Sequence, residues 1–124
     1  MSQADIQALR TAFDNVGRRG PEALDQLLDP QVEWFGIEPG PWDCHDRSKV
    51  LRTIREQLAP GVTTRVEELV EGGDKVVVGL RTRWPGRGED PPFYRVLTLR
   101  GGKIVRMQDC PDRASAFQTA GPAA

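Results

Sequence analysis

The sequence predicts an α+β fold, because helical patterns fill the first half of the chain and extended patterns fill most of the second half. In the first half, apolar residues recur every three or four positions, which is the spacing of one helix face. In the second half, β-branched and alternating apolar residues form runs that are bounded by Gly and Pro. These extended runs cover residues 62–71, 74–84, 93–100 and 103–109. A short strand over 31–35 precedes them, and we expect the helices to pack on one face of the sheet.

Three helices are predicted before the long strands, each with local start or stop signals. The first helix carries an apolar stripe that is made of Ile6, Leu9, Phe13 and Val16. Gly20-Pro21 ends this helix and opens a second, shorter one. Asp46 is placed to cap a third helix over 47–58. A closing helical turn over 112–118 and a frayed tail over 118–124 complete the expected chain.

The Gly101-Gly102 pair predicts a two-residue hairpin, because glycine takes positive φ readily at both central positions of such a turn. If Arg100 pairs with Lys103, three residue pairs share one face of the hairpin, since side chains alternate along a strand. These pairs are Thr98 with Val105, Val96 with Met107, and Tyr94 with Asp109. The face is mostly apolar and has an acid and a phenol at its far end, so we expect it to be a pocket wall.

The other face of the sheet is expected to be apolar as well. It would carry Val76, Val78, Leu80, Leu97, Leu99 and Ile104. A chain of this length has no further element to cover these side chains. We therefore expect a homodimer through the outer sheet face, with Trp84 near the contact.

Composition limits the classes of function. A chain of 124 residues predicts one domain over 1–124, and 17 basic against 18 acidic residues leave no excess of charge that favours nucleic acid. No apolar run approaches the ~18 residues of a membrane span, and the N-terminus lacks the apolar core of a signal peptide, so we expect a cytoplasmic protein. Cys44 and Cys110 lack metal-ligand spacing and the chain has a single His, so no metal and no cofactor are expected.

Three stretches carry a resemblance to a known family: RRGPEALDQLLDPQVEW, CHDRSKVLRTI and VLTLRGGKIVRMQD. Over about residues 5 to 117 the sequence resembles the nuclear transport factor 2-like superfamily, most closely its SnoaL-like (polyketide cyclase) branch. The resemblance implies a cone-shaped half-barrel in which three N-terminal helices pack on a curved, mainly antiparallel sheet around one enclosed pocket, usually in a dimer. It implies no single activity, because the superfamily includes isomerases, cyclases, epoxide hydrolases, dehydratases and non-catalytic binding domains.

Two catalytic patterns of the superfamily are incomplete here. Ketosteroid isomerases place a Tyr and two Asp residues where this chain has Phe13, Trp34 and Val96. Epoxide hydrolases of the limonene type use an Arg-x-Asp pair and a second Asp. The matching residues here are Arg81-Thr82-Arg83 and Asp109, and Arg83 cannot donate the required proton at ordinary pH.

Three residues are candidates for catalysis. Asp109 follows an apolar face and would be an ionised base or an anionic anchor, although it is also placed to cap the turn after the strand. Arg81 would be its partner or an oxyanion clamp, or alternatively a solvated charge at a strand end. His45 would be an auxiliary base at the pocket rim, or alternatively a surface residue that braces the third helix.

The substrate-binding candidates are apolar or aromatic side chains that serve equally well as core. They are Phe13, Trp34, Tyr94, Val96 and Met107. Trp42 is expected in a loop over the open end of the pocket. The sequence therefore predicts a homodimer that binds a small, partly apolar organic molecule. We expect cofactor-independent acid–base chemistry of a cyclase, isomerase, dehydratase or hydrolase. The alternatives are a binding module without turnover and a dimerisation domain.

Overall fold

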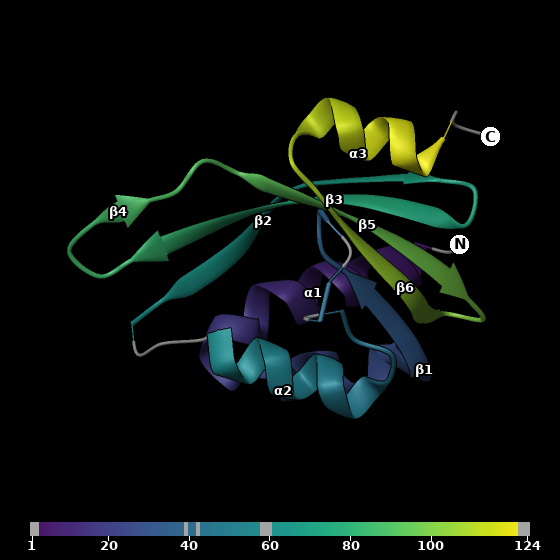
Figure 1. Ribbon diagram of the computed structural model, residues 1–124, viewed down its shortest axis with the longest axis horizontal. Coiled ribbons are helices and arrows are strands. Elements are labelled where there is room, and N and C mark those ends of the chain that lie inside the picture. Colours follow the sequence, from purple (N-terminus) through teal and green to yellow (C-terminus); the bar gives the residue numbers. More distant parts are fainter. Residues whose placement is uncertain (1–2, 39, 42, 58–60, 122–124) are drawn as a thin grey trace.

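The computed structural model describes residues 3–38, 40–41, 43–57 and 61–121 and confirms the α+β class. Helices α1 and α2 lie on one side of a curved, open sheet, and the short helix α3 lies on the other side (Figure 1). None of the described helices is long and apolar enough to cross a membrane. In chain order the elements are α1 (Gln3–Arg19), η1 (Pro21–Leu27), β1 (Leu28–Phe35), α2 (Arg47–Gln57), β2 (Thr63–Gly72), β3 (Lys75–Trp84), β4 (Gly88–Glu89), β5 (Phe93–Arg100), β6 (Lys103–Cys110) and α3 (Arg113–Ala120).

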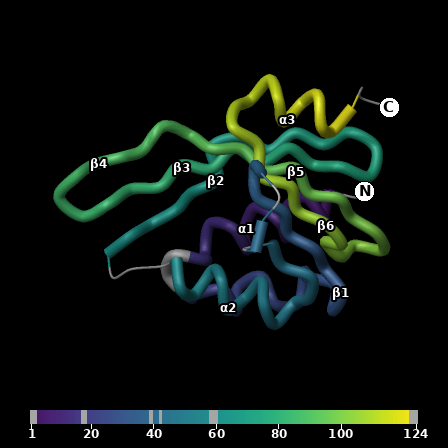
Figure 2. Tube along the Cα trace, viewed as in Figure 1, coloured from purple at the N-terminus to yellow at the C-terminus, as the bar shows by residue number. Residues whose placement is uncertain are grey.

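The sheet has the strand order β1-β6-β5-β3-β2, and the two-residue strand β4 pairs with β3. The pairs β2–β3, β3–β5 and β5–β6 are antiparallel, whereas β1 runs parallel to β6. The chain trace in Figure 2 shows how β1 returns from the helical side to lie along β6. The N-terminal and C-terminal halves of the chain therefore meet at the β1–β6 edge.

The predicted helix caps act as expected, but the type of the second helix, the start of β1 and the end of α3 differ from the prediction. Asp46 caps α2 by accepting a hydrogen bond from the Lys49 backbone N–H at 2.8 Å. The second helix is a 3₁₀ helix, and β1 begins directly after it at Leu28. Asp112 caps α3 through the Ser115 backbone N–H at 2.8 Å, and the helix continues to Ala120. Residues 118–120 are thus helical and not part of a frayed tail.

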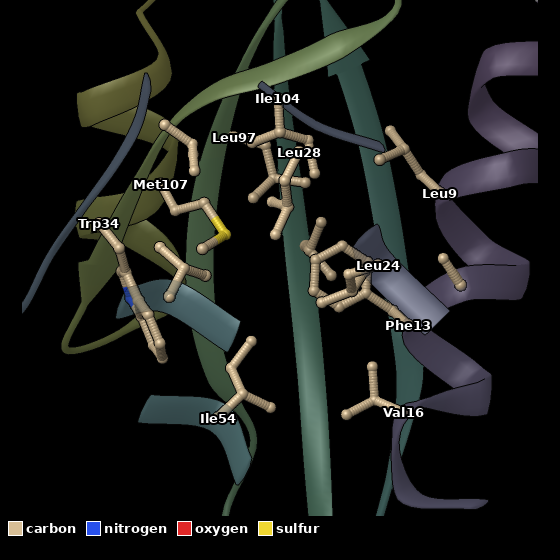
Figure 3. Packing of buried hydrophobic residues seen from close by; sticks show 14 of the residues in the cluster. Leu9, Phe13, Val16, Leu24, Leu28, Trp34, Ile54, Leu97, Ile104 and Met107 are labelled. Atoms are coloured by element: carbon tan, nitrogen blue, oxygen red, sulfur yellow. The ribbon is translucent and has the colours of Figure 1, made fainter. Parts of the chain in front are cut away.

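The main hydrophobic core lies between the helices and the inner face of the sheet. The expectation of an uncovered apolar outer face is wrong, because the residues assigned to it point into this core. Val76, Val78, Leu80, Leu97, Leu99 and Ile104 are all at most 8% exposed and belong to the core cluster. Figure 3 shows Leu97 and Ile104 from the sheet packed with Leu28 and facing Leu9 of α1. The helices cover the face that carries the larger set of buried aliphatic side chains.

The outer face of the sheet is covered by α3 and by ion pairs. Val77, Val96 and Cys110 pack against Ala116 of α3 in a second, smaller core cluster. Beyond α3, charged side chains pair across the strands, as in the 2.8 Å contact between Arg81 Nε and Glu67 Oε1. Among the described residues, the exposed large hydrophobic side chains are Ile37 and Val70. The homodimer remains a prediction, but the residues proposed to form it do not lie on the outer face.

The hairpin register also differs from the prediction, because β6 contains a bulge. Arg100 pairs with Lys103 and Leu99 with Ile104, but Thr98 pairs with Arg106, so Val105 is an extra residue in β6. Each later pair is displaced by one residue, and a one-residue shift moves a side chain to the opposite face. In the structure Tyr94 stands opposite Cys110 instead of Asp109.

Candidate functional site

A cavity of about 450 Å³ lies between the helices and the inner face of the sheet. Its apolar wall includes Phe13 and Val16 of α1, Leu24 of η1, Trp34 of β1 and Ile54 of α2. Figure 3 shows Trp34 and Ile54 on one side of the core and Phe13 and Val16 across from them. The volume is that of a typical small-molecule site. Its walls favour a ligand with a large apolar surface.

One acidic and one basic side chain lie together in this apolar wall. Arg95 stands directly opposite Asp109 in the β5–β6 pair, and Arg95 Nε donates a hydrogen bond to Asp109 Oδ1 at 2.6 Å. Trp34 Nε1 donates to the same carboxylate oxygen at 2.9 Å. The side chain of Arg95 is 10% exposed and that of Asp109 is 24% exposed. The β6 bulge creates this pair, because it places Arg95 instead of Tyr94 beside the acid.

The guanidinium group of Arg95 is fixed by its neighbours. It lies over the Trp34 ring, 4.5 Å from the centroid, and 5.4 Å from the centroid of Phe93. Within the described chain, only Nε of this group has a protein hydrogen-bond partner, and no fully buried side-chain nitrogen or oxygen lacks a partner. The two Nη groups of Arg95, a residue that lines the cavity, are therefore not fully buried and have donors available for a ligand oxygen.

The position of Trp34 depends on two backbone connections. In the parallel β1–β6 pair, Trp34 is the register partner of Met107. Met107 precedes Asp109 by two residues on β6. The backbone of Trp34 also forms two hydrogen bonds with Cys44, at 2.9 and 2.8 Å. The loop that leads to α2 is thereby joined to β1. These contacts hold the indole N–H against the Asp109 carboxylate.

A second group of polar side chains lines the cavity near the end of β3. Trp84 Nε1 donates to Asp90, and Arg87 pairs with the same carboxylate at 3.2 Å. The hydroxyl oxygens of Thr64 and Thr82 lie 3.3 Å apart. Asp90 is thus already paired with a cation and an indole. Trp84 was expected on the outer face, but it lines the cavity.

The predicted lining residues divide into two groups. Phe13, Trp34 and Asp109 line the cavity, as does Tyr94. Although Tyr94 borders the cavity, its ring packs on the outer side of the sheet against Gly79, and its hydroxyl is hydrogen-bonded to Glu68. Two predicted lining residues, Val96 and Met107, do not line the cavity: Val96 packs under α3, and Met107 is fully buried in the main core. Trp42 lies outside the described residues.

Two of the three catalytic candidates lie away from the cavity. Arg81 is on the outer face of β3, where it pairs with Glu67 and donates to the Asp90 carbonyl oxygen at 3.2 Å. The side chain of His45 is 65% exposed and lies 3.2 Å from Glu33 on the outer side of β1. Neither residue contacts Asp109.

Arg95 is the functional candidate that the sequence interpretation missed. It is the one charged residue within the otherwise uncharged run Phe93–Leu99, and a charge in a buried strand requires a partner. That signal was available in the sequence. The identity of its partner was not, because it depends on the bulge.

Cys110 also borders the cavity, but its thiol contacts the Thr119 hydroxyl of α3, and burial raises its pKa above the ordinary value. A thiol with a raised pKa stays protonated at neutral pH and is a poor nucleophile. Within the described part of the chain, no three His, Cys, Asp or Glu residues are grouped to hold a metal ion. Asp109 and Arg95 form an ion pair whose two members both line the cavity.

Comparison with known proteins agrees with the fold. The family model for the SnoaL-like domain matches residues 9–107. An NTF2-like protein of unknown function from Burkholderia pseudomallei is 21% identical, with a TM-score of 0.69, and the match covers 98% of this chain and 100% of that chain. TerC, crystallised with polyporic acid, is 24% identical with a TM-score of 0.66, covering 94% and 96% of the two chains. An LEH-like epoxide hydrolase from M. tuberculosis is 13% identical with a TM-score of 0.68, covering 92% and 86%. No curated protein matches the sequence significantly.

Proposed function

Because the chain belongs to the SnoaL-like domain family, we propose that it binds a small, partly apolar carbonyl compound and removes a proton from the carbon beside the carbonyl. The reaction uses no cofactor: Asp109 is the base, and Arg95 holds the oxygen. The observation that carries this proposal is the 2.6 Å Arg95–Asp109 pair in the wall of the 450 Å³ cavity. At the identities above, the solved structures support the fold and not a particular substrate.

Asp109 has the contacts that a base requires. Its described hydrogen bonds come from Arg95 and Trp34, and both reach Oδ1. Both partners donate to this oxygen, as a base held in place by its neighbours requires. Among the described residues none donates to Oδ2, which leaves this oxygen to accept a proton from the substrate.

Arg95 supplies the complementary charge. When a C–H bond next to a carbonyl is broken by a base, negative charge moves to the carbonyl oxygen. The Nη groups of Arg95, which lines the cavity, are available donors, and their orientation is held by Trp34, Phe93 and Asp109. A preorganised donor stabilises the developing enolate more than the neutral ketone, which is the condition for catalysis.

The charge balance of the site favours a neutral substrate. Arg95 and Asp109 are together neutral, and proton transfer to Asp109 leaves an enolate beside Arg95, so the total charge does not change. A ligand that enters as an anion would instead add a net negative charge to a cavity with a carboxylate in its wall. Epoxide opening is less well supported, because it needs an acid to donate a proton to the epoxide, and both acids of the cavity, Asp109 and Asp90, are already in contact with an arginine.

The test is hydrogen–deuterium exchange at the α-carbons of 2-tetralone, a bicyclic ketone, followed by proton NMR in D₂O. Asp109→Asn should lower the catalysed rate by about 10²–10⁴-fold, the usual contribution of a general base. Arg95→Met should lower it by about 10²–10³-fold, as for loss of an oxyanion donor.

The matched control is Arg100→Met, an exposed arginine on the same strand, which should exchange at the wild-type rate. An Asp109→Asn protein that keeps the wild-type rate would contradict the assignment of the base. If 2-tetralone quenches tryptophan fluorescence and its α-hydrogens do not exchange, the non-catalytic binding module is the better description.

A further inference from the structure

A second, smaller cavity adjoins the first at Asp109. It has a volume of about 130 Å³ and is lined by Trp34, Gly36, Thr53, Gln57 and Asp109. Trp34, Gln57 and Asp109 line the large cavity as well. The carboxylate that we propose as the base is therefore reached from two cavities.

The two cavities differ in the chemistry of their walls. Three of the five residues that line the small one have polar side chains, namely Asp109, Thr53 and Gln57, and the others are Gly36 and Trp34. A water molecule occupies ~30 Å³ in the liquid and needs two to four polar partners, so this cavity suits several waters and is too small for the organic substrate. The large cavity, by contrast, has Phe13, Val16, Leu24 and Ile54 in its wall.

We propose that the small cavity holds water that exchanges the proton of Asp109 with solvent while the large cavity is filled by substrate. This inference rests on the proposed function. In the first step Asp109 takes the proton, the C–H electron pair becomes the enolate, and the enolate oxygen lies beside Arg95. In the second step Asp109 gives this proton to water and receives another, which it returns to carbon. The carboxylate and the ketone are regenerated.

The second route matters because an apolar substrate displaces water from the large cavity. Without another path, Asp109 would return the same proton to the carbon from which it came. The C–H bond would then break and re-form with no exchange of hydrogen with solvent. Water in the small cavity makes the exchange step faster than this internal return, so the breaking of the C–H bond limits the observed rate.

The experiment fills the small cavity by Thr53→Leu, since Thr53 lines this cavity and not the large one. Exchange of 2-tetralone is measured for the protiated ketone in D₂O and for the α-deuterated ketone in H₂O. In the wild type we expect a full primary isotope effect. In Thr53→Leu we expect exchange to fall several-fold, the isotope effect to approach one, and the Kd from tryptophan fluorescence to stay unchanged.

Arg52→Leu is the control, because it introduces the same side chain at an exposed neighbouring position of α2. It should behave as the wild type. A wild-type rate in Thr53→Leu would overturn the water route, and so would a slower rate with an unchanged isotope effect. If Asp109→Asn exchanges hydrogen as fast as the wild type, the proposed function itself fails. This outcome is distinct from the two results with Thr53→Leu, which overturn only the water route.

A second measurement does not depend on the variant. With 2-tetralone bound to the wild type, NMR should detect magnetisation transfer between water and the Thr53 methyl group. Loss of this transfer on binding would show that the ketone displaces the water, and it would overturn the proposal.

Discussion

Arg95 and Asp109 face each other across β5 and β6, and a 2.6 Å hydrogen bond joins Arg95 Nε to Asp109 Oδ1 inside the cavity. The contact joins two charges that are largely withdrawn from water, at 10% and 24% side-chain exposure. Removal of either partner leaves the other charge in a poorly hydrated place. The pair is therefore important for stability as well as for the proposed chemistry.

The first prediction concerns this pair. Arg95→Met should lower the free energy of unfolding by about 2–3 kcal/mol, because it leaves the Asp109 carboxylate with Trp34 as its remaining described donor. Asp109→Asn should have a smaller effect, and the double variant should be more stable than the sum of the two single effects predicts. Urea unfolding of all four proteins measures the coupling, and strictly additive effects would contradict it.

The second prediction concerns Gly79, which faces Tyr94 across β3 and β5. A Cβ atom at position 79 would lie 2.9 Å from Tyr94 Cε1 and 3.4 Å from the Cβ of Glu68. We expect Gly79→Ala to lower stability by about 1–3 kcal/mol, the usual effect of overpacking. Tyr94→Leu should reduce this loss by removing the ring.

The control for this prediction is Gly40→Ala, where a Cβ would meet nothing within 4 Å. Its unfolding midpoint should stay close to that of the wild type. Equal losses at the two positions would show that the loss at 79 does not come from contact with Tyr94.

The third prediction is that α3 separates from the sheet in acid. The hydrogen bond from Arg113 lowers the pKa of Glu68, and the Ser115 backbone N–H lowers that of Asp112. A carboxyl group with a lowered pKa in the folded state stabilises that state at higher pH. This contribution is lost as the pH falls below about 4.5, the ordinary value for glutamate, and through the lowered value.

Amide hydrogen exchange of residues 113–120 should therefore quicken on acidification before that of β5. Glu68→Gln should weaken the attachment of α3 at neutral pH and reduce its pH dependence. Simultaneous opening of α3 and β5 at every pH would contradict this prediction.

The fourth prediction separates the oligomeric state from the core. Leu97 is fully buried under the helices, so Leu97→Glu should unfold the chain, since an unpaired buried charge costs several kcal/mol. Circular dichroism should show the loss of structure at any protein concentration. A folded monomeric Leu97→Glu protein would instead support a dimer through this strand, and light scattering of the wild type measures the oligomeric state directly.

The order of the main helices and strands was determined by the sequence alone, because the signals for them are local, although the second helix is a 3₁₀ helix and the short strand β4 was not predicted. Leu9 and Phe13 of the predicted helix stripe are buried, Asp46 caps α2, and Gly101-Gly102 forms the turn between β5 and β6. Phe13 is buried, and Asp109 and Trp34 line the cavity, while the roles predicted for them in binding and catalysis remain predictions. For the helix stripe, the cap and the turn, the spacing of neighbouring residues decides the structure.

The composition of the site was decided by tertiary structure. One extra residue, Val105, moves the β5–β6 register by one position and brings Arg95 instead of Tyr94 to Asp109. A bulge is stabilised by the packing of the whole strand pair, and the local sequence around Val105 carries no strong signal for it. The choice between the two faces of the sheet is likewise made by the helices, which bury the face of Leu97 and leave Arg81 on the other side. Alternation along a strand tells which residues share a face, but only contacts between distant segments tell which face becomes the interior.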